Sequence, residues 1–368
     1  MLFTMSPTKF SRISQSIIFF GERTHTSKIL AASFDPKLTG ALLVALLYYP
    51  ERLQSILPAR LRSYVISPAF VRALKTLLVF GVLRKVNRKL SQLALNGWKS
   101  DARFVKSQEV VLITGGSSGI GEIMARDFSS KGVKVVVMDI NPPKNPFPSN
   151  IQFYRVDVTS SSNIAAAASE IRKSCGDPTV LINNAGIGYL KTILHGTEDQ
   201  IRRTFEVNTI SHFLMAKEFL PAMIKKNHGH IVTIASLASY IVHASNVDYS
   251  CTKASALAFH EGLAAELKFR YNAPNVRTTV VNPAWIRTPL IEAMIAHPEF
   301  KDKVLEPETV TNAVVNQVLS GRSGQIILPG ELSVLSTIRA WPSWLQTSFR
   351  NMIAPSLAMF DEQGKTAT

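Results

Sequence analysis

The feature that most limits the fold of this chain is a glycine-rich turn placed directly after an apolar run. Residues 110–121 read VVLITGGSSGIG and are followed by an amphipathic segment. This order predicts a strand, a tight turn and a helix, which is the arrangement that phosphate binding requires. Three glycines at fixed spacing are weak evidence alone, so the strand before them and the helix after them make the prediction specific.

Each residue of this turn has a physical task in the predicted dinucleotide site. Gly115 permits the tight turn, Gly119 lets the backbone approach a pyrophosphate, and Gly121 lets helix and strand pack closely. The helix N-terminus offers N–H groups and a partial positive charge to the phosphates. We expect Ser117 and Ser118 to donate hydroxyl hydrogen bonds, and we count Ile120 among the cofactor-binding residues.

The next strand predicts which dinucleotide binds. Residues 133–140 read VKVVVMDI, and Asp139 lies 18 residues past Gly121. A carboxylate at this strand end accepts hydrogen bonds from ribose hydroxyls and repels a 2′-phosphate. Ser118 stands where a phosphate-binding enzyme often has a basic residue. Both features favour NAD, whereas the nearby Lys144 keeps NADP open.

Further strands at 151–156 and 179–183 alternate with helical stretches. Alternation of this kind predicts an α/β fold, a Rossmann-type doubly wound parallel sheet of about seven strands with helices on both faces. Asp157 follows the first of these strands and is expected near the adenine amino group. Asn184, in the Asn-Asn-Ala-Gly stretch 183–186, is expected at the cofactor, although such a stretch is also an ordinary turn after a buried strand.

A serine, a tyrosine and a lysine form the chemical constellation. Ser236 follows the apolar stretch HIVTIA, Tyr249 comes 13 residues later, and Lys253 lies four residues further on. Residues 249–269 contain no proline and predict a helix, on which positions four apart share a face. A tyrosine and lysine at this spacing are common on surfaces; the serine and the upstream glycine turn make this pair specific.

With these motifs the chain resembles the classical short-chain dehydrogenase/reductase family over about residues 107–330. The resemblance rests on the glycine turn, the stretch 183–186, Asn208, and the Ser236, Tyr249 and Lys253 set. It implies that Tyr249 exchanges a proton with the substrate oxygen, helped by the charges of Lys253 and the nicotinamide. It also implies that Ser236 orients that oxygen, that Lys253 holds the nicotinamide ribose, and that Asn208 steadies Lys253 through a water. No metal is expected.

The resemblance extends to further cofactor contacts. Residues 281–288 (VNPAWIRT) correspond to the family's loop after strand six, and Pro283, Ile286 and Thr288 are expected at the nicotinamide end. Ala284 stands where the family usually has glycine, which puts the detailed shape of this loop in doubt. Lys217 matches a basic residue linked to the cofactor in relatives, but a solvated helix base explains it equally well.

The basic charge of the chain is concentrated in its first 107 residues. They hold 17 Lys or Arg against 4 acids, which accounts for 13 of the net +15 charges. A basic and apolar segment predicts contact with an anionic membrane surface, and no nucleic-acid motif accompanies it. The first 34 residues alone have the composition of a mitochondrial transit segment, which we consider the less favoured reading because the apolar content continues beyond them.

Two stretches of this extension are apolar. Residues 38–49 (LTGALLVALLYY) lack charge but are too short to cross a bilayer upright. Residues 70–95 combine helically spaced apolar residues with a basic side, which predicts a helix lying in a membrane interface. The alternative is a helix packed on the catalytic body with its bases solvated. Prolines at 50, 58 and 68 break the region into short helices and favour a hairpin.

The expected domains are therefore an extension at 1–107, the dinucleotide-binding body at 108–330, and a tail at 331–368 that covers the pocket or contacts a membrane. The tail carries Trp341, Trp344, Phe349 and Arg350, and together with the extension it resembles the retinol and 17-beta-hydroxysteroid dehydrogenases of the endoplasmic reticulum and lipid droplets. That similarity implies a lipophilic alcohol or ketone, of the retinoid, steroid or fatty alcohol class, and a catalytic domain on the cytosolic side.

Two other hypotheses stay open from the sequence. One is a carbonyl reductase for a soluble or biosynthetic, polyketide-like substrate whose extension serves only for targeting. The other is a membrane scaffold without activity, which the intact serine, tyrosine, lysine and asparagine set disfavours. By analogy with the family, helices at 198–226 and 249–270 are expected to form a homodimer interface.

Overall fold

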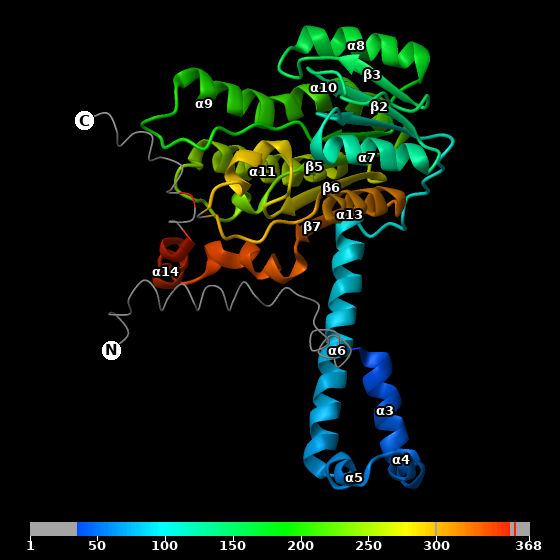
Figure 1. Ribbon diagram of the computed structural model, residues 1–368. Coiled ribbons are helices and arrows are strands. Elements are labelled where there is room, and N and C mark those ends of the chain that lie inside the picture. The colour runs from blue at the N-terminus through cyan, green and yellow to red at the C-terminus, as the bar shows by residue number, and fades with distance from the viewer. Residues whose placement is uncertain (1–34, 299, 354–356, 358–368) are drawn as a thin grey trace, which may run out of the picture. The chain divides into compact units, whose positions relative to one another are not determined.

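The computed structural model describes residues 35–298, 300–353 and 357 (Figure 1). These residues divide into two compact units, one ending at Ala94 and one beginning at Leu95. The predicted N-terminal transit-like composition at 1–34 lies outside the described residues. Each unit is described by itself.

The first unit is a helical hairpin whose turns are made by prolines. It consists of α3 (Pro36–Tyr48), α4 (Pro50–Ile56), α5 (Ala59–Val65) and α6 (Pro68–Leu95). Pro50 and Pro68 open α4 and α6, and Pro58 is the residue before α5, where a missing N–H does no harm. Gly40 of α3 approaches Leu78 of α6, so these two helices pack together, and α4 and α5 connect them at one end of the hairpin (Figure 1).

The second unit contains the predicted parallel sheet. Its seven strands run in the order β3-β2-β1-β4-β5-β6-β7, all parallel. Their bounds are β1 Val110–Thr114, β2 Lys134–Asp139, β3 Ile151–Arg155, β4 Val180–Asn183, β5 Gly229–Ile234, β6 Val276–Pro283 and β7 Gly324–Leu328. The central strands are fully buried, as expected for a parallel sheet covered on both faces. The Rossmann-type fold and the helical extension are thus confirmed.

Helices cover both faces of this sheet. One face packs against α8 (Ser161–Ser174), α10 (Ser211–Lys226) and α11 (Val247–Phe269), and the other against α7 (Gly119–Ser130) and α13 (Pro307–Leu319) (Figure 1). The chain turns from one direction of winding to the other between β1 and β4. In open α/β sheets a crevice forms outside the carboxyl ends of the strands at such a switch point.

The helix expected over 198–226 is divided in three. A short helix α9 (Glu198–Phe205), begun by a capping box of Thr197 and Gln200, leads into a π-helical turn at Glu206–Ile210 and then into α10. Single π turns inside α-helices occur mostly at functional positions. This one contains Asn208, so the irregularity falls at one of the predicted site residues.

The structure moves the predicted boundary between extension and body from residue 107 to residue 95. The buried Arg277 of β6 donates hydrogen bonds to the backbone oxygens of Asn96 (2.9 Å), Gly321 (3.2 Å) and Ser100. The Asn96 side chain also accepts from the N–H of Ser323. These bonds make residues 96–104 part of the body, a docking that charge composition could not reveal.

The C-terminal tail packs on the body next to the carboxyl edge of the sheet. It forms the 3-10 segment η5 (Gly330–Ala340) and helix α14 (Ser343–Ile353). Trp341, Phe349 and Ile338 pack against Leu237 and Tyr240, which follow β5. Trp344 remains 70% exposed. The tail beyond residue 353, apart from Leu357, lies outside the described residues.

Candidate active site

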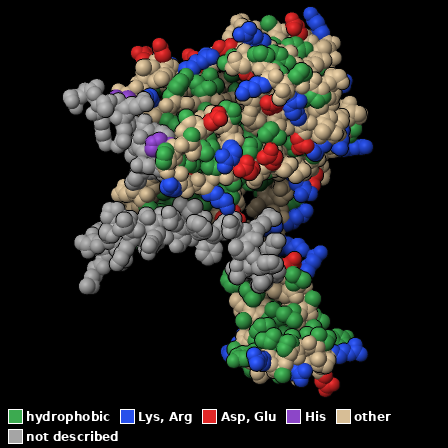
Figure 2. Space-filling model, in the orientation of Figure 1, with side chains coloured by type: hydrophobic (Ala, Val, Ile, Leu, Met, Phe, Trp, Pro, Cys, Tyr) green, Lys and Arg blue, Asp and Glu red, His purple; other side chains and the backbone are tan. Residues whose placement is uncertain are grey.

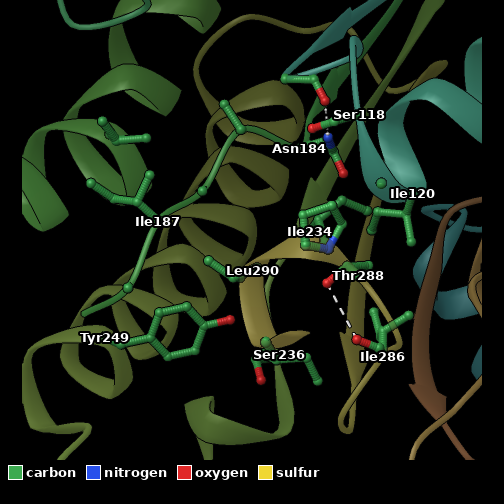
Figure 3. A pocket seen from close by; sticks show the side chains of 18 of the residues that line it. Ser118, Ile120, Asn184, Ile187, Ile234, Ser236, Tyr249, Ile286, Thr288 and Leu290 are labelled. Carbon is green, nitrogen blue, oxygen red and sulfur yellow. Dashed lines mark hydrogen bonds between the residues drawn. The ribbon is translucent and has the colours of Figure 1, made fainter. Parts of the chain in front are cut away.

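A cleft of about 520 Å³ lies at the switch point of the sheet. Loops that follow the six strands β1 to β6 line it together with the start of α11. Most of the residues predicted for the site line this cleft: Gly115, Gly119, Ile120, Asp139, Asp157, Asn184, Ser236, Tyr249, Lys253, Pro283, Ile286 and Thr288. In Figure 3, Ser118 and Asn184 stand at one end of the cleft, and Tyr249 and Ser236 at the other.

The glycine turn holds the first helix tightly against the strand edge. Gly119 has a φ of 55°, a backbone region that favours glycine. A Cβ on Gly121 would lie 2.1 Å from the Gly115 carbonyl oxygen and 2.6 Å from Asn184 Nδ2, so only glycine fits there. The first turn of α7 has no side-chain cap and opens beside the cleft. Its backbone N–H groups suit a phosphate, and the turn therefore fits the predicted dinucleotide.

Ser117 has a different place from the one expected. Its N–H donates to Asp139 Oδ2 at 3.0 Å, while its hydroxyl is buried without a hydrogen-bond partner among the described residues. Ser117 is not among the residues that line the cleft, whereas Ser118 is. The turn points the second serine toward the cleft and the first one into the body.

Asp139 ends β2 with its carboxylate held by the backbone. It accepts hydrogen bonds from the N–H groups of Ser117 and Asn141, each at 3.0 Å. Both bonds hold the carboxylate in a fixed orientation at the edge of the cleft. This geometry fits a ribose diol and opposes a 2′-phosphate, in line with the sequence-based expectation of NAD.

Asp157 is engaged with the protein and with a residue that sequence reasoning missed. Its carboxylate accepts from the Thr159 hydroxyl (2.7 Å) and from Arg203 Nη2 (3.0 Å). These bonds, with the backbone N–H of Thr159, lower the pKa of Asp157 although burial opposes them. Arg203, from α9, also lines the cleft. It lies 46 residues from Asp157, so no local pattern indicated the pairing.

Lys217 does not reach the site. It is exposed on α10 and is absent from the residues that line the cleft. Lys217 was assigned to the cofactor because it matches a basic residue of the family. The structure instead supports the alternative, a solvated basic residue on a helix. Gly121 and Asn208 also lie outside the lining, but both contact residues that form it.

Ser236, Tyr249 and Lys253 converge at one end of the cleft. Figure 3 shows the Tyr249 phenol pointing into the cleft from α11. Burial raises the pKa of Tyr249 to about 12, and its hydrogen bond with Ser236 opposes that rise. Lys253 Nζ lies 5.4 Å from the Tyr249 ring centroid and donates to the Ile234 carbonyl at 2.9 Å. Burial lowers the pKa of Lys253 to about 8.

These values set the protonation states near neutral pH. A pKa of about 12 keeps Tyr249 as a phenol, and a pKa of about 8 keeps Lys253 mostly as an ammonium. The pair can therefore donate a proton to an oxygen placed beside Ser236. Accepting one requires additional positive charge next to the phenol, because burial disfavours the phenolate.

Asn208 contacts the site through the backbone of the cleft. Its Oδ1 accepts from the N–H of Ile187 at 2.8 Å, and its Nδ2 donates to the Ile187 carbonyl (2.8 Å) and the Thr252 hydroxyl (3.1 Å). It thereby ties the loop after β4 to the helix that carries Tyr249 and Lys253. A Cβ on Gly186 would lie 3.5 Å from Asn208 Oδ1 and 3.6 Å from Lys253 Nζ, so both side chains meet at that glycine.

Comparison with known proteins places this site in a family. The family model described as short chain dehydrogenase matches residues 109–298, slightly more than half of the chain. The chain therefore belongs to the short-chain dehydrogenase family. The expectation of an oxidoreductase that acts on CH–OH groups is confirmed, as is the similarity to 17-beta-hydroxysteroid dehydrogenases.

Several relatives show how far the similarity reaches. The chain is 44% identical over 226 residues to dehydrogenase RED2 of Cochliobolus heterostrophus, over 59% of this chain and 85% of the relative. It is 34% identical over 239 residues to estradiol 17-beta-dehydrogenase 11 of Homo sapiens, over 62% and 78%. The solved structure of ligand-free aldohexose dehydrogenase from Thermoplasma acidophilum matches 62% of this chain and 94% of its own, with a TM-score of 0.55 and 26% identity.

Proposed function

We propose that this protein is an NAD-dependent oxidoreductase that interconverts an alcohol and its carbonyl on a lipophilic substrate. The observation that carries the proposal is the cleft itself, in which the Tyr249 phenol and Ser236 stand among apolar side chains such as Ile187 and Leu290. Such a cleft suits a retinoid, a steroid or a fatty alcohol, whose hydroxyl is its main polar group. The relative named for estradiol, at 34% identity, supports the same class.

In this proposal Tyr249 is the acid and base at the substrate oxygen. During reduction the phenol donates its proton to the oxygen of the former carbonyl, and Ser236 orients that oxygen by a hydrogen bond. During oxidation the phenolate takes the hydroxyl proton, and the nearby Lys253 ammonium stabilises it. The nicotinamide supplies or accepts the hydride when bound.

We further propose that the hairpin associates with a lipid surface, at the endoplasmic reticulum or a lipid droplet, with the body in the cytosol. The support is an array of exposed apolar side chains, including Leu38 (56%), Ile56 (80%), Phe80 (59%) and Leu83 (58%), which Figure 2 shows gathered on this unit with basic residues among them. Clusters of exposed apolar side chains commonly mark the place where a protein contacts another protein or a membrane. Among the described residues no single helix has the length and apolarity to cross a bilayer; α5 and α6, bent by 68° at their junction, meet that test only as a pair.

The substrate test uses the full-length chain in detergent micelles. Oxidation of estradiol, retinol and 1-dodecanol is followed by nicotinamide absorbance with NAD and with NADP, and glucose serves as the polar comparison. We expect turnover of at least one lipophilic alcohol with NAD and none of glucose. Turnover of glucose alone, or of polar carbonyls alone, would overturn the lipophilic assignment and favour the reductase for a soluble substrate.

The lipid-surface test uses flotation with vesicles that contain anionic phospholipid. Leu83→Glu replaces an exposed apolar side chain of α6 by a charge. The control Asn87→Glu places the same charge one helical turn further along the same face, at an exposed position that is already polar, so it removes no apolar side chain. We expect the first variant to float several-fold less than the second. Equal flotation of both, or a wild type that stays at the bottom of the gradient, would refute membrane association through the hairpin.

A further inference from the structure

Residues 285–298 and 300–305, which we call the flap, follow β6 at the end of the cleft that holds Ser236 and Tyr249. Its two ends are fixed to each other: Leu305 donates its N–H to the Trp285 carbonyl at 2.8 Å, and Arg287 donates its N–H to the Leu305 carbonyl at 2.9 Å. Ile286 and Leu305 form a parallel bridge between these bonds. Trp285 is thus the first flap residue, and its backbone position is set by the end of β6.

The Trp285 side chain is held on three sides. Its indole Nε1 donates to Asp302 Oδ2 at 3.0 Å. The Phe300 ring meets it edge-on with centroids 6.1 Å apart, and the His243 ring lies 5.7 Å away at 51°. His243 comes from the segment between Ser236 and Tyr249. The indole therefore joins the flap to the segment that carries the predicted catalytic residues.

Among the described residues, the Trp285 indole has one hydrogen-bond partner, Asp302, and its other contacts are with apolar and aromatic side chains. Trp285 lines the cleft and packs in a cluster with Ile291, Met294 and Leu190. A partly buried indole N–H requires an acceptor, and among the described residues Asp302 supplies it. That hydrogen bond fixes the orientation of the indole, since its contacts with Phe300 and His243 are ring contacts without a hydrogen bond.

We propose that Trp285 determines substrate specificity by forming the apolar wall beside the reacting carbon, and that Asp302 is a positioning residue that acts through the indole. The substrate class is an alcohol with a rigid, flat apolar body next to its hydroxyl, such as a steroid or a retinoid. This inference rests on the proposed function, since it assigns the side chains that recognise the lipophilic part of the substrate.

The experiment compares two alcohols in the full-length protein: estradiol, which reaches the wall, and 2-propanol, which is too small to do so. Asp302→Ala should raise KM for estradiol about tenfold while kcat with 2-propanol and the Kd of NADH stay within twofold. Asp302→Asn retains an oxygen acceptor and should behave as wild type. The matched control Glu306→Ala removes an exposed carboxylate from the base of the flap, where it accepts from Arg287 at 3.2 Å, and should change neither alcohol.

A double-mutant cycle separates action through the indole from a general weakening of the flap. Trp285→Phe keeps an aromatic ring without the N–H, so adding Asp302→Ala to it should change KM for estradiol by less than twofold. An undiminished tenfold effect in that background would overturn the positioning role. Equal losses with estradiol and 2-propanol would overturn the specificity role.

Failure of the proposed function gives a different result. If wild-type protein turns over neither estradiol nor retinol, the lipophilic assignment itself fails, and the assignment of the wall fails with it. If wild type turns over either one, and Trp285→Ala has the same KM for that alcohol as wild type, only the inference about the flap is wrong.

Discussion

Both edges of the parallel sheet carry buried polar side chains, but they use them differently. At the carboxyl edge, the half-buried Tyr249 and the buried Lys253 direct their functional groups to a cleft. At the amino edge, Arg277 is 1% exposed and donates to four backbone oxygens, and Glu109 pairs with His228 at 3.0 Å. The carboxyl edge leaves polar groups available to hydrogen-bond a ligand, whereas at the amino edge the polar groups hydrogen-bond other residues of the chain.

The contrast teaches how to separate activity from stability in this fold. Substitutions at the carboxyl edge should reduce turnover while the free energy of unfolding stays nearly constant. Substitutions at the amino edge should lower the free energy of unfolding while turnover of the folded fraction is kept. Four substitutions test this division, two at each edge.

The largest effect is expected for Tyr249→Phe at the carboxyl edge. Loss of the proton donor should lower kcat by about 10³-fold, within the range for general acid–base catalysis. The variant removes one hydroxyl whose pKa burial already raises to about 12, so the unfolding midpoint should stay close to that of wild type. Steady-state assay, NADH titration and thermal unfolding measure the three quantities. A variant with wild-type turnover would refute the acid–base role of Tyr249.

The same edge predicts a pH dependence. Because the pKa of Tyr249 is raised, the phenol form dominates at neutral pH, and Tyr249 needs no prior change of protonation before it donates its proton in reduction. Oxidation needs the phenolate, so its rate should rise with pH through the alkaline range, whereas reduction should fall there. An oxidation rate that is independent of pH between 7 and 10 would contradict the assignment.

Arg277→Met at the amino edge should give the next largest effect. It removes the donor to the carbonyls of Ser100 and Pro274, which have no other donor among the described residues, and one of two donors at Asn96 and Gly321. This loss should lower the free energy of unfolding by about 3 kcal/mol. The control is Arg322→Met, because Arg322 is 50% exposed and pairs with Asp101 of the same docked segment; we expect a loss below about 1 kcal/mol there. Urea unfolding distinguishes them, and equal losses would show that burial of the arginine is unimportant.

The sequence predicted the carboxyl edge far better than the amino edge, and the reason is chemical. Gly121, which lies against the Gly115 carbonyl, and the pair Tyr249 and Lys253, one helical turn apart, can be recognised in the sequence because few other residue types can take these positions. Arg277 contacts residues up to 181 positions away in sequence, and only the fold brings them together. The roles of Arg203 and Asp302 were not predicted for the same reason, since only the tertiary structure brings them to their hydrogen-bond partners.

Asp139→Ala tests the cofactor end of the carboxyl edge. Removal of the carboxylate abolishes the repulsion of a 2′-phosphate and the acceptor for a ribose hydroxyl, so the ratio of kcat/KM for NADP to that for NAD should rise about tenfold, equivalent to about 1.4 kcal/mol. Asp157→Ala is the comparison, because that carboxylate is already paired with Arg203. An unchanged ratio in Asp139→Ala would overturn the assignment of NAD.

The smallest effect is expected for His228→Gln at the amino edge. Its hydrogen bond with Glu109 raises the pKa of His228, so the stability from this group is present below the ordinary value of 6.5 and is lost as pH rises through the raised value. The pKa of Glu109 is lowered by the same bond, against burial, so its contribution is present above 4.5 and is lost as pH falls through the lowered value.

The pair therefore stabilises the fold most between about pH 4.5 and 6.5. The His228 side chain is 36% exposed, so solvent screening limits the gain to below about 1 kcal/mol, and the charge of Lys226 reduces it further. The difference in unfolding free energy between wild type and His228→Gln should be largest near pH 5.5 and should shrink by pH 9. Because the pair lies at the edge away from the cleft, kcat/KM should be unchanged at both pH values. A change in turnover without a change in stability would contradict the division between the two edges.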